Sequence, residues 1–378
     1  MVIGELSETY PPTQDGVGRV SLAYCRGLEQ LGHTVYYIAP EDAGKTHVPG
    51  LKTLLYKSVQ IPKQNYRIGI PGMSWEFKKT LKEIPFDILH LHTPFLSAKV
   101  AREILEERDI PVVATFHSKY YDDFYKATKS KLIATNAVNS VLKVYERCDG
   151  VWTVNHETAR VLQSYGYQGR IDIVPNGTDL PELNPAGAEL AKKNLGLRKG
   201  IPVLLFVGQI DMKKNIHSIL KACAILKERE EPFYLLLAGE GPDRAKLQKM
   251  AHELGIAAEA RFLGFMSNAE ELSNLYALAD LFVFPSEYDN APMVVREAAA
   301  NGTPALTIRG SCSAEGIIHG ENGFLCKNTP EDIADGILSA LPECARAGIK
   351  ARETIPMPWN EIMKDVVQRY QSLIDARK

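Results

Sequence analysis

A strand–helix alternation that runs through the first half of the chain and then starts again is the strongest constraint on its fold. In the first half, short apolar runs such as "MVIGEL", "HTVYYIAP", "FDILHLH" and "IPVVATFH" are separated by stretches with apolar residues at helical spacing. The pattern restarts with "IPVLLFVGQ" and continues through "FYLLLAGEG", "ARFLGFM" and "LFVFPS". Strands joined by helices over short connections form parallel sheets flanked by helices. The sequence therefore predicts two doubly wound α/β units in tandem.

The length of the chain fits this division, because 378 residues exceed what one compact core usually holds. The segment "TDLPELNPAG" carries two prolines and several turn formers, and is the predicted linker. We expect an N-terminal Rossmann-like domain over residues 1–180 and a C-terminal one over residues 181–358. A last helix over residues 359–378 has a stripe of apolar side chains at helical spacing and must cover an apolar surface.

Charge and cysteine content exclude several classes of protein. The chain has 44 Lys and Arg against 46 Asp and Glu, which argues against a nucleic-acid-binding module. Its six cysteines show no C-x-x-C pair and no zinc-ligand spacing, so we expect reduced thiols. Glu5 and Glu8 occupy positions where a signal peptide needs apolar residues, and no apolar run reaches the roughly 20 residues of a membrane span. We expect a cytoplasmic protein, at most peripheral on the inner face of a membrane.

The segment between residues 52 and 82 departs from this balance. Seven basic residues there accompany one acid, Glu76. They are Lys52, Lys57, Lys63, Arg67, Lys78, Lys79 and Lys82. A solvated basic face is one interpretation, and attraction to an anionic membrane surface or acceptor is the other.

Loops after strands are the places to look for a site, because open parallel sheets bind ligands at the carboxyl ends of their strands, and two facing sheets would create one cleft. Gly16 and Gly18 follow the first strand, where glycines let a ligand approach the backbone, although a plain turn is an alternative. His117 ends the strand "VVATFH" and either faces the cleft or is a structural hydrogen-bonding group. His90 and His92 share one strand face, but we expect no carboxylate partner and interpret them as structural.

The stretch "VGQIDMKKN" follows the first strand of the second domain. It offers Gly208, Gln209, Lys213 and Lys214, with Asn215 as the expected N-cap of the next helix. Lysines at a helix amino terminus suit a diphosphate, because free N–H groups there already favour anions. A solvated lysine pair is the alternative.

The stretch "PSEYDNAPMVVREAAANGTPA" follows the buried run "LFVF" and opens a helix. The free N–H groups in the first turn of this helix suit a phosphate. The carboxylates of Asp289 and Glu297 suit vicinal hydroxyls, since a carboxylate can accept a hydrogen bond from each hydroxyl of a diol. Phosphate and polyol together describe a nucleotide sugar. In the alternative interpretation, Asp289 caps the helix and Glu297 pairs with Arg296 or another neighbour.

Taken together, these loops resemble the retaining GT-B glycosyltransferases of the group-1 (family-4) type. The matching stretches follow the order and spacing of the family over nearly the whole chain. They are "SETYPPTQDGVGR", "FDILHLHTPF", "IPVVATFHS", "DIVPNGTD", "FVGQIDMKKN", "LLLAGEGPDR", "RFLGF" and "LFVFPSEYDNAPMVVREAAANGTPA". The resemblance implies two Rossmann-like domains facing across a cleft, with the last helix crossing back to the first domain.

The resemblance also implies roles for residues of the second domain. The two acids of the family's signature align with Asp289, which would meet sugar hydroxyls, and with Glu297, which would meet the ribose diol. Backbone N–H groups of Ala291 to Met293 would meet the sugar and phosphate, and Lys214 matches the diphosphate lysine. The chain departs from the family where Gln209 replaces an arginine, where Asn290, Ala291 and Pro292 replace P-F-G, and where the first acid is an aspartate.

In the first domain, Gly16 to Gly18 resemble the loop near the diphosphate and acceptor, and His117 resembles a histidine near the transferred sugar. Glu8 and Tyr10 are candidates for contact with the acceptor. The segment "TFHSKYYDDF" resembles the same region in bacterial diacylglycerol glucosyltransferases, and the mixture "KYYDDFYKATKSK" would suit a lipid head group.

The resemblance therefore implies transfer of a hexose, with retained configuration, from a nucleotide diphosphate sugar such as UDP-glucose to an acceptor hydroxyl. No cofactor and no metal would be required, and the acceptor would be a lipid or a saccharide, including a glycolipid or cell-envelope acceptor. Two alternatives share this architecture: a nucleotide-sugar epimerase or hydrolase, and a non-catalytic nucleotide-sugar-binding protein.

Overall fold

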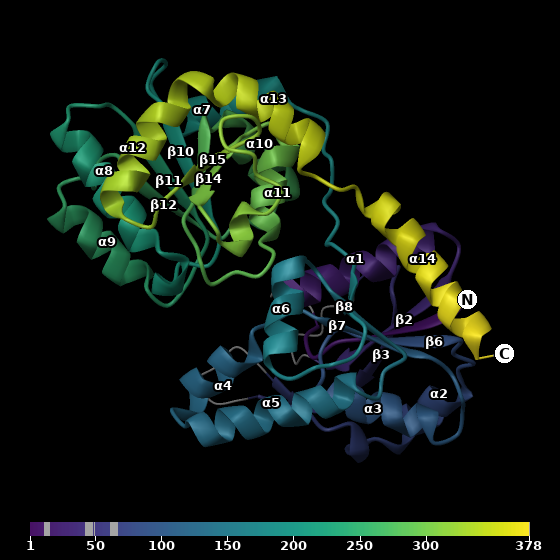
Figure 1. The fold of residues 1–378 in the computed structure, drawn as a ribbon. Helices are drawn as coiled ribbons and strands as arrows, with labels where there is room; N and C mark the ends of the chain where they lie inside the picture. Colours follow the sequence, from purple (N-terminus) through teal and green to yellow (C-terminus); the bar gives the residue numbers. More distant parts are fainter. Residues whose placement is uncertain (11–15, 42–47, 49, 61–66, 378) are drawn as a thin grey trace. The chain divides into compact units, whose positions relative to one another are not determined.

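The computed structural model describes residues 1–10, 16–41, 48, 50–60 and 67–377. The chain forms two compact units, and Figure 1 shows the elements of each. Unit 1 comprises Met1–Gly177 together with Trp359–Lys378, and unit 2 comprises Thr178–Pro358. The carboxyl-terminal helix therefore belongs to the same unit as the amino terminus.

Unit 1 is built on a seven-stranded parallel sheet in the order β3-β2-β1-β6-β7-β8-β9. Its strands are β1 (Val2–Leu6), β2 (Thr34–Pro40), β3 (Lys52–Tyr56), β6 (Ile88–Leu91), β7 (Val112–Phe116), β8 (Gly150–Thr153) and β9 (Asp172–Ile173). Its helices are α1 (Gly16–Gln30), α2 (Trp75–Glu83), α3 (Leu96–Leu105), α4 (Tyr120–Thr128), α5 (Lys131–Tyr145), α6 (His156–Ser164) and α14 (Trp359–Ala376), with a single 3-10 turn η1 (Pro71–Met73). An antiparallel pair, β4 (Ser58–Gln60) and β5 (Arg67–Gly69), completes the described elements of this unit.

Strand alternation gives the two faces of the unit 1 sheet different characters. Alternate residues such as Leu89 and Ala114 face a hydrophobic core shared with α2, α3 and α5. The opposite face lies beneath α1 and α14, which pack side by side in Figure 1. Their approach is close, since a Cβ on Gly27 would lie 2.5 Å from Cγ of Met363. The apolar stripe of the last helix therefore packs on α1.

Unit 2 contains a six-stranded parallel sheet in the order β12-β11-β10-β13-β14-β15. Its strands are β10 (Val203–Val207), β11 (Tyr234–Ala238), β12 (Ala260–Gly264), β13 (Leu281–Phe284), β14 (Ala305–Ile308) and β15 (Phe324–Cys326). Its helices are α7 (Pro185–Asn194), α8 (Ile216–Glu228), α9 (Arg244–Glu253), α10 (Ala269–Leu278), α11 (Met293–Ala300), α12 (Pro330–Ala340) and α13 (Cys344–Thr354). Its 3-10 turns are η2 (Met212–Lys214), η3 (Cys312–Ala314) and η4 (Leu341–Glu343).

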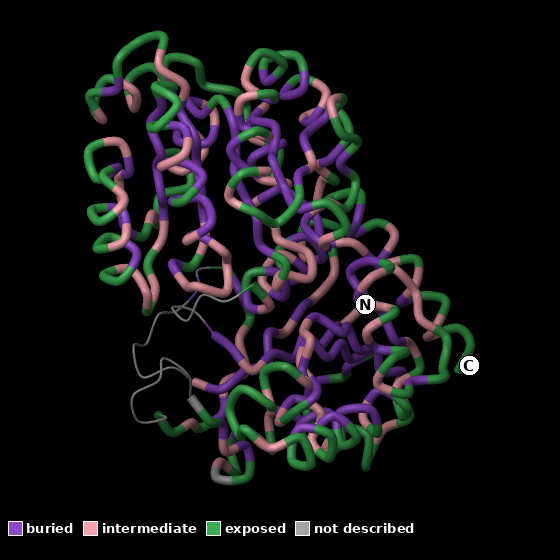
Figure 2. Tube along the Cα trace, turned by 60° about the vertical axis from the view of Figure 1, so that its left-hand side comes forward, coloured by how far each residue is buried: buried purple, intermediate pink, exposed green. Residues whose placement is uncertain are grey.

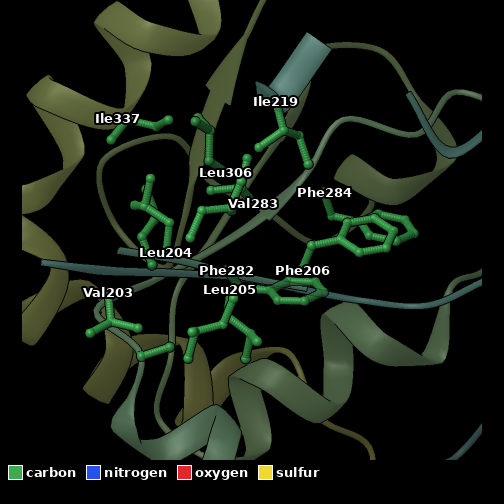
Figure 3. Packing of buried hydrophobic residues seen from close by; sticks show 14 of the residues in the cluster. Val203, Leu204, Leu205, Phe206, Ile219, Phe282, Val283, Phe284, Leu306 and Ile337 are labelled. Atoms are coloured by element: carbon green, nitrogen blue, oxygen red, sulfur yellow. The ribbon is translucent and has the colours of Figure 1, made fainter. Parts of the chain in front are cut away.

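The central strands of unit 2 are apolar along their whole length because helices cover both faces of the sheet. Every residue of β10 and β13 is buried. Figure 3 shows Phe206, Phe282 and Phe284 packed with aliphatic side chains of neighbouring strands and helices. Figure 2 shows the same contrast along the trace, with buried strands and more exposed helices and loops. The predicted pair of doubly wound parallel sheets is confirmed.

Each sheet reverses its strand order at one place. In unit 1 this switch point lies between β1 and β6, and in unit 2 it lies between β10 and β13. Loops that leave the carboxyl ends of such strands diverge and leave room for a ligand. Within the described residues, no helix combines the length and apolar character needed to cross a membrane.

Candidate active site

Glycines shape the loop that follows β10 in unit 2. Gly208 has φ +153° and Gly239, after β11, has φ +140°. A Cβ on Gly239 would lie only 1.9 Å from the carbonyl oxygen of Gly208, so a side chain there is excluded. A Cβ on Gly241 would likewise lie 2.3 Å from the carbonyl oxygen of Ile210. The two loops therefore pack backbone against backbone, which fixes the path of the chain toward η2.

Two carboxylates hold η2, the 3-10 turn that carries both candidate lysines. Asp211 Oδ1 accepts the N–H of Lys213 at 2.9 Å, and Asp243 Oδ2 accepts the N–H of Met212 at 2.9 Å. The first acid comes from the loop after β10 and the second from the loop after β11. The backbone position of Lys214 is therefore set by two loops of the sheet edge.

Lys214 and Asp289 meet at the switch point between β10 and β13. The Lys214 ammonium donates to Asp289 Oδ1, and Ser286 Oγ donates to Oδ2 of the same carboxylate at 2.6 Å. The two charged side chains are only 17% and 18% exposed, so solvent and salt screen the pair less than a surface ion pair. Lys213 lies over the ring of Tyr288, with its Nζ 4.3 Å from the ring centroid. The structure brings together two residues whose mutual contact was not predicted.

Helix α11 begins directly after this pair. Its N-cap is Pro292, which supplies no side-chain hydrogen bond to the first turn. Asp289 is engaged by Lys214 and Ser286. One turn into the helix, Glu297 Oε2 accepts a hydrogen bond from the Tyr276 hydroxyl at 3.0 Å. This contact orients the carboxylate.

The remaining predicted donor residues flank the pair. Gln209 is exposed, and Asn290, Ala291, Pro292 and Met293 are all partly buried. Gln209 belongs to the loop after β10, and the other four residues lie at the end of the connection from β13 into α11. The donor-binding residues predicted in unit 2 therefore lie at adjacent strand ends of one sheet, whereas Gly16 and Gly18 belong to unit 1.

Asn215 occupies the N-cap position of α8, as expected, but the expected capping bond is absent. Its backbone is left-handed, with φ +59°, and its side chain turns to other loops. The side-chain amide donates to the Pro285 carbonyl at 3.3 Å and to Asn328 Oδ1 at 2.5 Å, while its oxygen accepts from Ser218 Oγ at 2.7 Å. Asn215 therefore ties the lysine-bearing loop to the loop after β13.

The acceptor-side candidates in unit 1 have structural partners. Glu8 Oε1 accepts the Ser97 N–H at 2.7 Å and its hydroxyl at 3.0 Å, so the carboxyl sits at the start of α3, where a negative charge is stabilised. Burial raises the pKa of Glu8 and the Ser97 bonds oppose that rise. Tyr10 is buried, and its ring centroid lies 6.0 Å from that of Tyr37. Both side chains support the local fold.

The glycines expected in the first loop lie inside a helix. Gly16 and Gly18 belong to the first turn of α1, while residues 11–15 of the same stretch lie outside the described residues. Gly18 is buried and its carbonyl accepts from Ser21 Oγ at 3.1 Å. Among the described residues, no atom lies within 4 Å of a Cβ built on Gly16.

His117 lies at the end of β7, where it joins a buried polar network. His117 Nε2 is 3.2 Å from His92 Nδ1, and His92 Nε2 is 2.7 Å from Glu5 Oε2. The expectation that His90 and His92 have no carboxylate partner is therefore wrong. Strand β1 pairs with β6 so that Glu5 is the register partner of His90, which brings the carboxylate to the histidines.

The network continues to the carboxyl-terminal helix. Tyr370 of α14 donates to Glu5 Oε1 at 3.0 Å, and its oxygen is 2.6 Å from His90 Nδ1. His90 Nε2 is 2.7 Å from Thr115 Oγ1. Ligand-type atoms of Glu5, His90 and His92 lie within 4.8 Å of one another, a spacing compatible with a metal ion. Each of their ring nitrogens and carboxylate oxygens already has a protein partner, so we interpret the cluster as a hydrogen-bonded network.

Burial sets the protonation of this network. Desolvation raises the pKa of Glu5 to about 8. The hydrogen bond from Tyr370 acts in the opposite direction and lowers this pKa. Desolvation lowers the pKa of His92 to about 3 and holds those of His90 and His117 well below their ordinary value. The histidines are therefore neutral near pH 7 and serve as hydrogen-bonding groups, not as charges.

The basic segment of unit 1 is paired with acids from other parts of the sequence. Lys57 pairs with Glu41, Lys78 with Glu103, Lys79 with Glu83 and Lys82 with Glu107. Lys63 lies outside the described residues. These pairs reduce the local positive charge, which favours the interpretation of this segment as a solvated basic face.

Several residues of the two strand edges gave no clear signal in the sequence. Glu5 and Tyr370 are far apart in the chain, and Ser286 and Tyr276 are ordinary polar residues. The indication that the sequence did offer is Glu5 itself, a charged residue inside the apolar run "VIGEL". A charged side chain buried in a strand needs a polar partner. Ser286 and Tyr276 contact the candidate residues Asp289 and Glu297 directly, whereas Glu5 and Tyr370 belong to the network that reaches His117.

The fold and the strand edge define the class of protein first: a tandem doubly wound α/β protein whose second unit places Lys214, Asp289 and the start of α11 at the switch point of its sheet. Residues 188–353 match the family described as Glycosyl transferases group 1, and residues 14–182 match Glycosyltransferase Family 4. The chain belongs to the GT-B glycosyltransferases of this group-1, family-4 type.

Relatives with assigned names agree with this membership. The chain is 26% identical over 348 residues to alpha-monoglucosyldiacylglycerol synthase of Streptococcus pneumoniae, covering 90% of this chain and 78% of that protein. In structure it is similar to sucrose-phosphate synthase of Thermosynechococcus elongatus, with a TM-score of 0.83, 20% identity and 99% of each chain covered. It is also similar to Anabaena HepE in complex with UDP-glucose, with a TM-score of 0.79, 17% identity, and coverage of 98% and 100%.

The predicted family and the GT-B fold are confirmed by these comparisons. The protein is a glycosyltransferase that takes its sugar from a nucleotide-sugar donor.

Proposed function

We propose that the protein transfers a hexose from a nucleoside diphosphate sugar, with UDP-glucose the first candidate, to an acceptor hydroxyl with retention of configuration and without a metal ion. The observation that carries the proposal is the meeting of Lys214 and Asp289 at the start of α11. A cation and the amino terminus of a helix at one strand edge suit a diphosphate. The naming of HepE as a complex with UDP-glucose supports this donor.

In this proposal Lys214 binds the diphosphate, and Asp289 accepts hydrogen bonds from the sugar hydroxyls. Their ion pair holds both side chains at the strand edge before the donor arrives, so little ordering remains to be done on binding. Glu297, oriented by Tyr276, accepts from the ribose diol. The exposed Gln209 supplies no charge, so Lys213 and Lys214 carry the electrostatic stabilisation that an arginine would share.

The chemical step breaks the bond between the anomeric carbon and the diphosphate oxygen and forms a bond to the acceptor oxygen on the same face of the sugar. The acceptor proton passes to the departing diphosphate oxygen, and a nucleoside diphosphate is released. Lys214 and the α11 amino terminus stabilise the negative charge that develops on the leaving group. His117 contacts the transferred sugar as a neutral hydrogen-bonding group, consistent with the low pKa that burial gives it.

We place the acceptor among lipids with a hydroxylated head group at an anionic membrane surface. The name of the Streptococcus pneumoniae relative supports this class. So does the surface around α4 and α5, where Tyr125, Leu132 and Ile133 are 40%, 71% and 52% exposed. Three lysines border these apolar side chains, a combination that favours adsorption to an anionic bilayer. They are Lys126, Lys129 and Lys131.

A panel of nucleotide-sugar donors against lipid and saccharide acceptors, analysed by mass spectrometry and by NMR of the anomeric proton, tests the proposal. Transfer from a UDP-hexose to a diacylglycerol with an α-linkage is the expected result. An epimer or free sugar formed from donor alone would identify an epimerase or hydrolase instead. Binding of the donor with no product from any acceptor would identify a non-catalytic protein.

The lipid assignment has a separate test. Sedimentation with vesicles of phosphatidylcholine and phosphatidylglycerol should deplete the protein from solution at low salt. Replacing Leu132 and Ile133 by serine should reduce this binding, whereas the matched exchange of Val59, an equally exposed apolar residue of β4, should not. Equal binding by all three proteins would contradict the α4 and α5 surface as the membrane contact.

A further inference from the structure

The polar network of unit 1 connects Glu5 to the predicted sugar-contacting residue His117 through one intermediate, His92. The distances are 2.7 Å from Glu5 Oε2 to His92 Nε2 and 3.2 Å from His92 Nδ1 to His117 Nε2. The rings of His92 and His117 are stacked, with centroids 5.5 Å apart and an interplanar angle of 23°. Glu5 and His92 are fully buried and His117 is nearly so. No bulk water competes for these bonds.

The hydrogen positions in this chain follow from its chemistry. When Glu5 is ionised it only accepts, so the proton of His92 lies on Nε2, facing the carboxylate. His92 Nδ1 then carries no hydrogen and accepts. The contact between the two histidines therefore requires a hydrogen on His117 Nε2, because a neutral imidazole has one donor and one acceptor nitrogen. Above the pKa of Glu5, about 8, its carboxylate thus determines which nitrogen of His117 is protonated.

We propose that Glu5 and His92 are positioning residues that fix the ring orientation and the tautomer of His117. The inference rests on the proposed function, in which His117 contacts the transferred sugar. Glu5 and His92 themselves act only through His117. A sugar hydroxyl placed against His117 then meets a ring in which one nitrogen donates and the other accepts. Because this arrangement orients the sugar for reaction, its loss weakens transfer more than it weakens donor binding.

The same strand offers a matched comparison, His90. It is as buried as His92, it lies two residues away on the same face, and its ring centroid is 4.3 Å from that of His92. Its nitrogens contact Tyr370 and Thr115, and Nδ1 also lies 3.4 Å from Glu5 Oε2, but neither nitrogen lies between Glu5 and His117. A change at His90 therefore disturbs the packing and stability of the network to a similar extent while leaving the path to His117 in place.

Other ionisable groups around Glu5 hold their protons in the relevant pH range. Tyr24 and Cys25 face it from α1, and Tyr370 faces it from α14. Burial raises the pKa of all three groups above their ordinary values. Asp365 and Arg369 of α14 act on Tyr24 with opposite signs. The ionisation of Glu5 is therefore the event near pH 8 that bears on the tautomer of His117.

The decisive experiment is nitrogen-15 NMR of the full chain labelled at histidine, with His117 assigned from a His117→Gln spectrum. In the wild type at pH 9, His117 should be a neutral ring protonated at Nε2. In His92→Gln the amide retains the contact with Glu5 but no longer reaches His117, so the His117 signals should shift toward a mixture of tautomers. In His90→Gln they should match the wild type. A His117 protonated at Nδ1 in the wild type at pH 9 would overturn the proposal, even if neither variant folds.

Kinetics with the donor and acceptor found in the panel give the second readout. His92→Gln should lower kcat by about ten- to a hundredfold with the KM for the donor within about twofold. His90→Gln should keep kcat within about twofold, although both variants unfold at lower temperature. Equal losses of kcat in the two variants would overturn the positioning role. If the wild type transfers no sugar at all, the proposed function fails, while the NMR comparison still decides the link between Glu5 and His117.

Discussion

The two sheet edges use polar residues in opposite ways. In unit 2, Lys214 and Asp289 are charged, partly exposed and held by a few contacts from neighbouring loops. In unit 1, Glu5, His92 and His117 are buried beneath α1 and α14 and linked into a continuous network. In our proposal the edge in unit 2 binds an anion, because its charges remain partly accessible. The edge in unit 1 is built to hold neutral groups in a fixed arrangement.

This difference determines how each edge should respond to mutation. Removing a charge from the edge in unit 2 removes an interaction with the ligand and leaves the core of the unit untouched. Removing a group from the network in unit 1 leaves a buried polar partner unsatisfied, which costs about 1–3 kcal/mol of stability in addition to any effect on activity. The two edges are therefore separable by measuring activity and stability together.

The largest expected effect on activity is that of Lys214→Ala. Loss of this cation should remove about 2–4 kcal/mol of transition-state stabilisation. This loss corresponds to a fall in kcat/KM on the order of thirty- to a thousandfold. The thermal unfolding temperature should change little, because the side chain is not part of the core. Lys249→Ala is the control, since this lysine forms only an exposed pair with Glu253. An unchanged kcat/KM in Lys214→Ala would refute its role at the diphosphate.

Asp289→Asn should have the next largest effect. The amide keeps the size of the side chain but loses the charge that accepts from sugar hydroxyls and pairs with Lys214. A hydrogen bond to a charged group is worth about 1.5–3 kcal/mol, so kcat/KM should fall by about ten- to a hundredfold. Binding of the free nucleoside diphosphate, measured by calorimetry, should be unchanged or tighter because Lys214 is released. Equal weakening of nucleotide and nucleotide-sugar binding would contradict an assignment to the sugar.

The sequence could nominate the candidate site residues of unit 2 because their signals are local. Asp289 and Glu297 stand in one strand–loop–helix segment, and Lys214 stands in another, so strand ends and residue types sufficed. Their direct contact depends on β10 and β13 being neighbours, a property of sheet order.

The network of unit 1 was missed because its members are brought together only by tertiary structure. Glu5 and Tyr370 are separated by almost the entire chain, and their contact requires α14 to pack on the sheet face beneath α1. The strand period placed His90 and His92 on one face correctly, but the register of β1 against β6 was needed to find their carboxylate. The same limit applies to the basic segment, whose acidic partners come from outside it, such as Glu103 and Glu107.

The pH dependence of stability should distinguish the network in unit 1 directly. Folded unit 1 keeps the proton of Glu5 up to about pH 8, whereas the unfolded chain loses it near the ordinary value of 4.5. Between these values the folded state binds more protons, so the contribution of Glu5 to the free energy of unfolding falls as pH rises. The histidines act in the opposite direction, because the unfolded chain binds protons below their ordinary pKa of 6.5 and the folded unit does not. The network should therefore be most stabilising near pH 6.5.

Between pH 6.5 and 8, Glu5 should reduce the free energy of unfolding by on the order of 2 kcal/mol. All three tryptophans, at positions 75, 152 and 359, belong to unit 1, so tryptophan fluorescence during urea unfolding reports on this unit. This fall in the free energy of unfolding should be absent from Glu5→Gln. Subtracting the pH profile of the variant from that of the wild type removes the contributions of the other titrating groups. A parallel pH profile in both proteins would show that Glu5 is already ionised in the folded unit.

The smallest expected effect is that of Tyr276→Phe, which tests whether unit 2 uses a supporting hydrogen bond as unit 1 does. The change removes the 3.0 Å bond to Glu297 and keeps the buried ring, so unit 2 should lose only about 1 kcal/mol of stability. Glu297 would then sample more orientations, and the KM for the donor should rise by a few fold at constant kcat, because the ribose is bound equally in the ground and transition states. Tyr234→Phe is the matched control, since this tyrosine is also buried in unit 2 and its hydroxyl contacts Arg198. A fall in kcat with unchanged KM would place Glu297 nearer to the chemical step than to the ribose.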